Sequence, residues 1–347
     1  MRRVLGALVA FALLATPAGC GRSSEPYRAS REVLGTAVSV TAYPGDSRTL
    51  RAAVDVAFAR MSAIEHTLSP YDASSTISVL NRTPYESHGL PPEALAILRR
   101  TEALGVSTEF SPALFGVTRL YDFGGAGTVP GAHDLSAAVR EAASFKLSSD
   151  QRARFAPTPG RESSGTPGPG LDFGGASKGL ALDAATEVFR RAVPAGGGLI
   201  SAGSSTLAFG DKPDGEPWRV GIEDPREPGR VVALVSSSGP GTLSVSTSGD
   251  YQVYFDRGGV RYHHILDPAT GLPARGLRSL TVFGRMSGLD ADILSTALFV
   301  MGRDSALAYA RKKAAGVYLI DDAGKVASWV PPSLSGITLE EQAAPRR

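Results

Sequence analysis

The sequence predicts an α+β or mixed α/β fold, in which mixed sheets pack against helices. Short segments of β-branched or alternating residues, separated by Gly, Pro and Asp turns, are concentrated in the second half of the chain. Segments with the 3.6-residue spacing of amphipathic helices lie on either side of them. Strands and helices do not alternate strictly, as they would in a parallel βαβ fold. The 347 residues, 42% of them hydrophobic, are enough to bury one large core or two modest ones.

The first half of the chain contains one predicted strand and two clear helix signals. Residues 32–42 alternate valines with smaller residues and indicate a strand, whereas residues 50–68 carry apolar side chains at helical spacing. Residues 91–108 predict a second helix, because their Pro-Pro pair suits a first helical turn. The segment over residues 122–170 is rich in Gly and Pro and is predicted to be irregular, apart from a helix near residues 135–145.

From residue 170 onward the predicted elements follow one another closely. Residues 170–173 indicate a short strand that breaks at Gly174 and Gly175 into a helix running from Ser177 to about Ala192. Five further strands are predicted, over residues 198–209, 218–222, 231–236, 243–246 and 251–255.

The C-terminal part predicts a helix followed by a hairpin. Residues 289–312 have helical spacing with a break near Gly302. Residues 316–320 and 326–329 predict two strands joined by a turn. We expect a single domain and then a C-terminal tail, over residues 31–335 and 336–347.

The N-terminus has the features of a bacterial secretion signal. Two arginines precede an apolar segment over residues 4–16, which is too short to span a bilayer comfortably. Small residues then precede Cys20, the only cysteine of the chain, in a pattern that resembles the lipoprotein cleavage box. We expect a signal peptide over residues 1–19, lipidation of Cys20 and a polar tether over residues 20–30, with cleavage by ordinary signal peptidase as the alternative. Lipid on Cys20 would anchor the protein at the extracytoplasmic face of a bacterial membrane.

The charge balance gives no electrostatic case for nucleic-acid binding. The chain has 36 basic and 34 acidic residues, for a net charge of +2. Arg2 and Arg3 lie in the predicted signal peptide, which contains no acidic residue, so the mature chain would carry 34 residues of each sign. A neutral chain lacks the basic surface that nucleic acids require. Any phosphate must therefore be bound by local groups.

A strand-to-helix junction at residues 171–179 is the first candidate for ligand binding. Its adjacent glycines let the backbone approach a ligand, and the following helix would present free N–H groups that favour phosphate. Lys178 adds a positive charge. The junction matches neither a Walker A loop nor a G-x-G-x-x-G pattern. A turn in which the glycines serve packing alone is the alternative.

Residues 290–296 combine oxygen-bearing side chains on one face of a predicted helix. Asp292 and Thr296 are four residues apart, and Ser295 lies beside them. A carboxylate together with hydroxyl and carbonyl oxygens is a set that Mg²⁺ accepts. The alternative is a helix N-terminus whose acidic residues complement the helix dipole. The sequence has no paired Cys and His spacing of the kind that binds zinc.

Residues 262–271 contain two adjacent histidines and an Asp-Pro turn. The turn would hold a histidine close to a carboxylate, a pairing suited to proton transfer. Adjacent strand residues face opposite ways, so only one of His263 and His264 is expected to point into a given site. The alternative is a histidine that satisfies buried carbonyl groups of the turn. Residues 246–251, taken alone, indicate only a corner between two strands.

Taken together and in order, these segments resemble the ApbE family of FAD:protein FMN transferases. The likeness extends from Leu34 to about Gly302, and its strongest parts are residues 34–36, 68–71 with 77–81, 171–179 with 183, 218–225, 247–251, 262–273 and 291–302. The resemblance implies an ApbE-like (T-fold-like) architecture and an Mg²⁺-dependent reaction that cuts FAD at its pyrophosphate. FMN would be transferred to a Thr or Ser hydroxyl of an acceptor protein, typically a membrane redox subunit, and AMP would be released.

The resemblance also implies roles for particular residues. The metal would be held by the backbone carbonyl of Gly175 and by the side chains of Asp292, Ser295 and Thr296. FAD would be contacted by Leu34, Tyr71, Glu109, Phe110, Ser111, Asp172, Lys178 and His264. His264 would be the proton-transfer residue near the phosphorus, and Asp250 would support catalysis. These roles require residues 292–296 to meet residues 174–179 at one cavity.

Three residues depart from the family pattern. Leu34 stands where the family usually has Met, which is a tolerable apolar change. Ser111 replaces the Asp of a Phe-Asp-Pro segment, and Ser205 replaces another acidic residue. Because these changes bear on FAD affinity, two alternatives stay open. One is an FAD-binding envelope lipoprotein without efficient transfer, and the other is a hydrolase that cuts FAD into FMN and AMP.

Overall fold

The computed structural model describes residues 25–44, 47–157, 167–239 and 241–342. The predicted signal peptide, Cys20 and the first residues of the predicted tether lie outside these ranges. None of the helices within the described residues combines the length and the apolar character that crossing a membrane would require.

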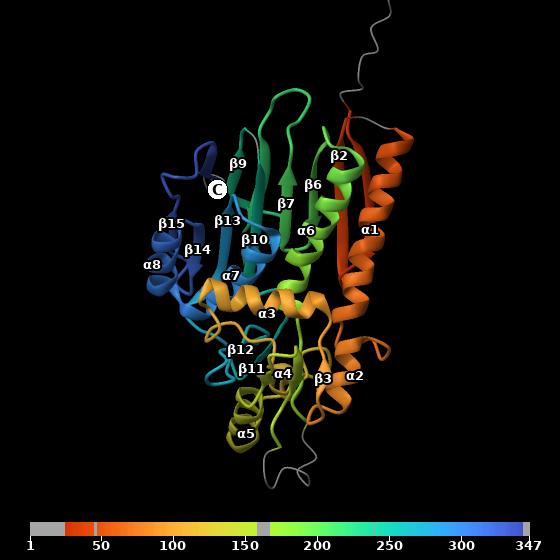
Figure 1. Ribbon diagram of the computed structural model, residues 1–347. Coiled ribbons are helices and arrows are strands. Elements are labelled where there is room, and N and C mark those ends of the chain that lie inside the picture. The colour runs from red at the N-terminus through yellow and green to blue at the C-terminus, as the bar shows by residue number, and fades with distance from the viewer. Residues whose placement is uncertain (1–24, 45–46, 158–166, 240, 343–347) are drawn as a thin grey trace, which may run out of the picture.

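An eight-stranded sheet, antiparallel throughout, organises the fold (Figure 1). Its strands lie in the order β1 (Tyr27–Val33), β2 (Thr36–Tyr43), β6 (Gly197–Ala202), β7 (Ser205–Phe209), β10 (Thr242–Gly249), β13 (Leu277–Gly284), β14 (Gly316–Asp321) and β15 (Val326–Trp329). Strand β10 therefore lies in the middle of the sheet, between strands that are distant from it in sequence.

One face of this sheet is covered by long helices. The helices α1 (Arg48–Leu68), α6 (Gly174–Ala192) and α7 (Gly288–Met301) pack side by side, with α6 between the other two. Their apolar faces and the inner face of the sheet form the main core. Within it, Phe58 of α1 and Phe189 of α6 are almost fully buried, and each such burial stabilises the fold by roughly 1.5–3 kcal/mol.

A smaller sheet covers the opposite face of the large one. It contains β16 (Ile337–Glu341), β9 (Val231–Ser237) and β8 (Trp218–Glu223) in that order. A second core, which includes Trp218, Val235, Val245 and Phe283, fills the space between the two sheets. The molecule therefore has three layers, and the predicted class of mixed sheets with packed helices is confirmed.

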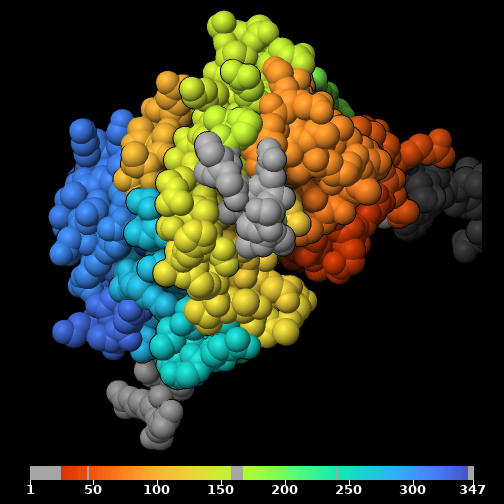
Figure 2. Space-filling model, turned by 90° about the horizontal axis from the view of Figure 1, so that it is seen from below, coloured from red at the N-terminus to blue at the C-terminus, as the bar shows by residue number. Residues whose placement is uncertain are grey.

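Shorter elements gather at one end of the large sheet. They are α2 (Thr76–Arg82), β3 (His88–Gly89), α3 (Pro92–Leu104), α4 (Phe115–Tyr121), α5 (Ala132–Ala143), β4 (Lys146–Leu147), β5 (Arg152–Arg154), β11 (Tyr254–Arg257) and β12 (Val260–His263). Figure 2 looks onto this end, where orange, yellow and cyan segments that are distant in sequence share one surface. The last helix, α8 (Arg303–Lys313), follows α7 after the predicted break at Gly302 and packs against it.

Several predicted boundaries are wrong, two of them because a tight turn divides the chain without breaking the alternation of residues in the sequence. The strand predicted over residues 32–42 is the β1–β2 hairpin, whose turn has Leu34 at φ 60° and Gly35 at φ 65°. The strand over residues 198–209 is likewise two strands, separated at Gly203 with φ 57°. Residues 337–341, assigned to a tail, pair with β9 as β16.

The junction before α6 also differs from its prediction. Residues 170–173 form no strand and contribute only an isolated bridge between Leu114 and Gly170. Helix α6 begins at Gly174, with Phe173 as its N-cap residue, so both glycines belong to its first turn. A strand needs a neighbouring strand to pair with along its length, and residues 170–173 have only the single bridge at Gly170 before α6 begins.

Gly179 marks the closest approach of α6 to α7. A Cβ atom added there would lie 2.2 Å from the carbonyl oxygen of Gly288 and 2.7 Å from Cβ of Asp292. We expect Gly179→Ala to lower the free energy of unfolding by about 3 kcal/mol, because overpacking forces the helices apart. Urea unfolding measures this change. Gly89→Ala is the matched control, since an added Cβ meets nothing within 4 Å; equal midpoints for the two variants would contradict the close contact.

Candidate active site

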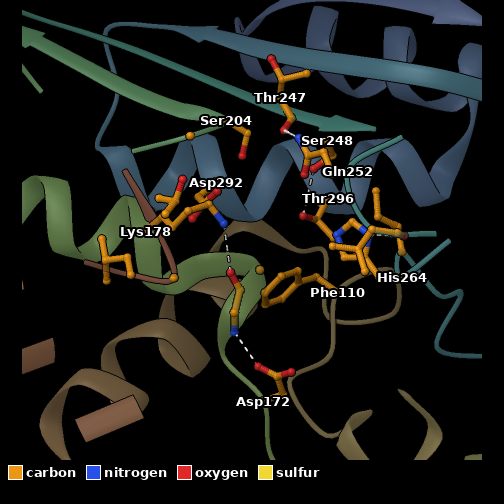
Figure 3. Close-up of a pocket in the computed structure, with 18 of the residues that line it drawn as sticks. Phe110, Asp172, Lys178, Ser204, Thr247, Ser248, Gln252, His264, Asp292 and Thr296 are labelled. Atoms are coloured by element: carbon orange, nitrogen blue, oxygen red, sulfur yellow. Dashed lines mark hydrogen bonds between the residues drawn. The ribbon is translucent and has the colours of Figure 1, made fainter. Parts of the chain in front are cut away.

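A cavity of about 920 Å³ lies where strand ends of the large sheet, the first turn of α6 and the covering loops meet. Its lining comes from segments that are far apart in sequence, including the β1–β2 turn, the loop before α4, the β6–β7 turn and the end of β10. Figure 3 shows labelled side chains around this space, among them Phe110, His264 and Thr296, which come from segments far apart in the sequence. A cavity of this size suits a large organic ligand.

All eight residues predicted to contact FAD line this cavity. They are Leu34, Tyr71, Glu109, Phe110, Ser111, Asp172, Lys178 and His264. One oxygen of the Glu109 carboxyl group, Oε2, is buried without a hydrogen-bond partner among the described residues. Such an atom is costly unless a ligand or water satisfies it, which is what a binding site provides.

The first turn of α6 forms one wall of the cavity. The carboxylate of Asp172 accepts a hydrogen bond from the N–H of Gly174 at 2.8 Å, and Lys178 donates to the carbonyl of Gly174 at 3.3 Å. Burial raises the pKa of Asp172, and the hydrogen bond from Gly174 and the charge of Lys178 oppose that rise. A Cβ atom on Gly175 would lie 3.0 Å from the Phe110 ring, so only glycine leaves this turn open beside the ring.

The start of α7 is fixed by charged groups from two other helices. Asp183 of α6 accepts hydrogen bonds from the N–H groups of Gly288 and Leu289 at 2.7 and 2.9 Å. Burial raises the pKa of Asp183 to about 6. Asp290 forms a two-point ion pair with Arg100 of α3. Asp183 thereby satisfies two of the free N–H groups at the start of α7, and the ion pair ties its first turn to α3.

Asp292 joins α7 to α6 at the cavity. Its Oδ2 atom accepts a hydrogen bond from the N–H of Gly179 at 2.8 Å. Asp292, Thr296 and Gly175 all line the cavity, whereas Ser295 is buried behind it. The predicted meeting of residues 292–296 with residues 174–179 is therefore confirmed.

His264 is the histidine that faces the cavity. Its Nδ1 atom lies 3.2 Å from the carbonyl oxygen of Val253, and because a carbonyl only accepts, Nδ1 carries the proton in this contact. Within the described part of the chain, Nε2 has no hydrogen-bond partner, and the residue lines the cavity. Burial lowers the pKa of His264 to about 4, partly offset by the Val253 hydrogen bond, so the ring is neutral at physiological pH. The predicted pairing with a turn carboxylate is wrong, because Asp267 instead accepts from the N–H of Ala269 at 2.8 Å.

His263 points the opposite way, as the alternation of strand residues predicts. It is buried, and its Nε2 atom lies 2.9 Å from the carbonyl oxygen of Ala274. Burial lowers its pKa as well. The alternative reading of a histidine that satisfies a buried carbonyl thus describes His263, while His264 remains available for chemistry.

Asp250 lies beside the cavity rather than in its lining. Its carboxylate forms a two-point ion pair with Arg226, with N–O distances of 2.7 and 2.6 Å. Its neighbour Tyr251 does line the cavity. Because Arg226 engages both carboxylate oxygens and Asp250 does not line the cavity, a direct catalytic role for Asp250 stays a prediction without geometric support.

Several polar contacts of the site were not predicted from the sequence. Ser205 and Ser246 hydrogen-bond to Asp292, and Ser248 hydrogen-bonds to Thr296. The alternation of residues along the predicted strand at 243–246, extended by two positions, would have put Ser246 and Ser248 on one face. Other polar residues that were not predicted also line the cavity, among them Thr206, Glu223, Thr247 and Gln252.

The site could hold a cation of the Mg²⁺ type. Among the described residues no group of three or more His, Cys, Asp or Glu side chains is suitably placed to hold a metal ion. A cation would therefore rely on the carboxylate of Asp292, neutral oxygens from Thr296 and Gly175, water, and a bound phosphate. This is how proteins usually hold Mg²⁺, which keeps several waters and shares substrate phosphates.

Comparisons with known proteins agree with this geometry. The ApbE family matches residues 34–320. A FAD:protein FMN transferase of Treponema pallidum is 30% identical over 326 residues, which cover 89% of this chain and 88% of that relative. A FAD:protein FMN transferase of Haemophilus influenzae is 38% identical over 152 residues, a match that spans only 43% of each chain.

A solved structure has the same architecture along nearly its whole length. The crystal structure of the ApbE protein from Thermotoga maritima superposes with a TM-score of 0.77 at 27% identity, covering 88% of this chain and 97% of that one. The family match includes the start of α6, the histidine turn and the first turns of α7, which are the segments that build the cavity. The chain belongs to the ApbE family.

Proposed function

We propose that this protein transfers the FMN half of FAD onto a Thr or Ser hydroxyl of an acceptor protein, with Mg²⁺ bound and AMP released. The observation that carries the proposal is the single cavity in which the first turn of α6, the oxygen ligands of α7 and His264 meet. Membership of the ApbE family and the names of the relatives support the same activity.

The charges of the cavity explain why a divalent cation would be needed. Four acidic side chains line it, from Glu109, Asp172, Glu223 and Asp292, against one basic side chain, from Lys178. A pyrophosphate brings further negative charge into this surrounding, so binding without a counter-ion is disfavoured. Mg²⁺ held by Asp292, Thr296 and the carbonyl of Gly175 would neutralise the phosphate oxygens and polarise the phosphorus.

His264 supplies the route for the acceptor's proton. In the proposed reaction the acceptor oxygen forms a bond to the phosphorus of the FMN half, and the bond from that phosphorus to the bridging oxygen breaks. The hydroxyl proton passes to Nε2 of the neutral His264 ring, and AMP leaves with the bridging oxygen. A neutral ring with Nδ1 held by Val253 is already in the form that accepts a proton at Nε2.

Water in place of the protein hydroxyl would convert the same site into an FAD hydrolase. The two reactions use the same cation and the same proton acceptor and differ only in the attacking oxygen. Access of an acceptor protein to the cavity decides between them. We therefore keep hydrolysis to FMN and AMP as the second candidate function.

One experiment separates these activities. Purified protein is incubated with FAD and Mg²⁺, with and without detergent-extracted membrane proteins of the source organism. AMP release is followed by chromatography, and flavin fluorescence of protein bands is followed on denaturing gels. We expect AMP release together with a fluorescent band. AMP without a labelled band would favour hydrolysis, and FAD retention without AMP would contradict both enzymatic functions.

The location of the reaction is part of the proposal. Signal peptide cleavage before Cys20 and lipidation of that residue would place the enzyme on the extracytoplasmic side of a membrane, beside acceptors that are membrane redox subunits. Mass spectrometry of the mature N-terminus tests this directly. A diacylglyceryl-modified Cys20 is expected, and an unmodified N-terminus at another residue would contradict it.

The low pKa of His264 predicts an unusual titration. Because burial disfavours the charged ring, we expect its NMR resonance to titrate near pH 4 in the protein without FAD, below the ordinary histidine pKa of about 6.5. The neutral form of the His264 ring, which accepts a proton, therefore remains the major form as the pH falls from 7 to about 5. The His264→Gln spectrum assigns the resonance, and a pKa near 6.5 would contradict the buried environment.

A further inference from the structure

Four buried serines connect the two side chains proposed to hold the cation. They are Ser205 of β7, Ser246 and Ser248 of β10, and Ser295 of α7. Successive residues of a strand alternate between its faces, and Ser246 and Ser248 both point toward α7. Only the cavity-facing end of this cluster, at Ser248, reaches the lining.

Hydrogen bonds occupy most of the Asp292 carboxylate. Its Oδ1 atom accepts from Ser205 at 2.9 Å and from Ser246 at 3.1 Å, and its Oδ2 atom accepts from the N–H of Gly179 at 2.8 Å. An ionised carboxylate has about four lone-pair positions. Three donors leave about one of them for a cation, so Asp292 can bind a metal through one oxygen only.

The direction of the remaining hydrogen bonds follows from counting hydroxyl hydrogens. Ser295 donates its hydrogen to the backbone carbonyl of Asp292 at 3.0 Å, and Ser246 donates its own to the carboxylate. Ser248, 3.0 Å from Oγ of Ser295, is therefore the donor in that contact. Because the hydroxyl hydrogen of Ser248 is directed at Ser295, the Ser248 oxygen accepts the hydrogen bond from the Thr296 hydroxyl at 3.1 Å.

This order fixes how Thr296 faces the cavity. Its hydrogen is directed at Ser248, so the lone pairs of its oxygen are left for a ligand. Without Ser248 the hydroxyl could rotate and point its hydrogen at the cation position. The four serines thus leave one carboxylate oxygen of Asp292 available to a cation and direct the lone pairs of the Thr296 hydroxyl toward the cavity.

We propose that Ser205, Ser246 and Ser248 are positioning residues of the cation site: Ser205 and Ser246 make it selective for Mg²⁺ over Ca²⁺, and Ser248 orients the Thr296 hydroxyl so that the site binds the cation tightly. Mg²⁺ requires compact octahedral coordination, for which single oxygens and waters suffice, whereas Ca²⁺ takes six to eight ligands and gains from a carboxylate that binds through both oxygens. The hydrogen bonds from Ser205 and Ser246 occupy Oδ1 of Asp292, so the carboxylate cannot bind a cation through both oxygens. The proposal rests on the cation site of the proposed function.

Competition between Mn²⁺ and Ca²⁺ tests the proposal without relying on turnover. Mn²⁺ substitutes for Mg²⁺, and its free concentration is read by electron paramagnetic resonance in the presence of protein and FAD. For Ser205→Ala and Ser246→Ala, we expect the ratio of the Ca²⁺ dissociation constant to the Mn²⁺ dissociation constant to fall by about tenfold relative to the unsubstituted protein. For Ser248→Ala, we expect about tenfold weaker Mn²⁺ binding, restored by Ser248→Thr.

Ser244→Ala is the matched control. Ser244 is a buried serine on the same face of β10, and it donates one hydrogen bond, to the carbonyl of Met286 at 2.7 Å. It has no hydrogen bond to Asp292 or Thr296 among the described residues, so its loss should leave both metal affinities unchanged. Cys variants, which keep the volume, replace any Ala variant whose thermal unfolding shows that it does not fold.

The outcomes separate this proposal from the function on which it rests. Absence of Mn²⁺ binding by the unsubstituted protein would overturn the cation site itself and the selectivity with it. Normal Mn²⁺ binding by the unsubstituted protein, with the same Ca²⁺ competition in Ser205→Ala and Ser246→Ala as in Ser244→Ala, would overturn the selectivity alone. Unchanged Mn²⁺ binding by Ser248→Ala would overturn the role of Ser248. A change in Ca²⁺ competition in Ser205→Ala and Ser246→Ala, together with weaker Mn²⁺ binding by Ser248→Ala, supports the proposal.

Discussion

Asp292→Ala is expected to lower metal-dependent turnover of FAD by roughly a thousandfold, because a metal ion contributes several kcal/mol to phosphoryl transfer. Asp292 carries the only carboxylate in the proposed ligand set, and MgCl₂ at ordinary concentrations should not restore the rate. Initial rates of AMP release as a function of Mg²⁺ measure the loss. Turnover that survives at ordinary Mg²⁺ would show that another group holds the cation.

Removal of Asp292 also leaves three hydrogen-bond donors without their acceptor, so folding must be measured in parallel. Asp292→Asn keeps an oxygen that can accept from Ser205 and Ser246 while removing the charge, and it should lose turnover with less loss of thermal stability. Asp304→Ala is the matched control, since Asp304 lies in the first turn of α8 and is exposed. It should keep the full rate.

His264→Ala is expected to slow FMN transfer by roughly a hundredfold to ten-thousandfold, the usual contribution of a positioned proton acceptor. Since the ring is neutral and carries no charge that FAD would lose, the dissociation constant of FAD should change much less. Single-turnover rates and flavin fluorescence titrations measure the two quantities separately.

His133→Ala is a suitable comparison, because the side chain of His133 is 92% exposed and lies outside the cavity lining. The rate of that variant should match the unsubstituted protein. If His264→Ala weakened FAD binding while single-turnover transfer at saturating FAD stayed unchanged, His264 would be a binding residue and the proton would need another acceptor.

The sequence predicted the elements whose signals are local. The helix α1, the pair α7 and α8 with the break at Gly302, and the β14–β15 hairpin have apolar periods or turn residues of their own, and all are confirmed. The β1–β2 and β6–β7 hairpins were predicted as single strands, because a two-residue turn leaves the alternating pattern of the sequence unbroken, although Leu34, Gly35 and Gly203 have positive φ. Strand β13 was missed, although it lies at the centre of the sheet between β10 and β14.

The sequence predicted which residues form the site but not the hydrogen bonds that hold them in place. Motif resemblance selected Asp292, Thr296 and His264, and these line one cavity. The contacts of Ser205 and Ser246 with Asp292 join residues 87 and 46 positions apart in the chain, which no local pattern encodes. The ion pair of Asp250 with Arg226 joins residues 24 positions apart in the chain, so no local pattern predicted it either.

Anomalous scattering from a crystal grown with Mn²⁺ and FAD is the most direct test of the central claim. We expect one strong peak bounded by the carboxylate of Asp292, the hydroxyl of Thr296 and the carbonyl of Gly175, with metal–oxygen distances of roughly 2.0–2.2 Å and a pyrophosphate oxygen among the ligands. A metal peak elsewhere, or a pyrophosphate bound away from the first turns of α6 and α7, would contradict the account.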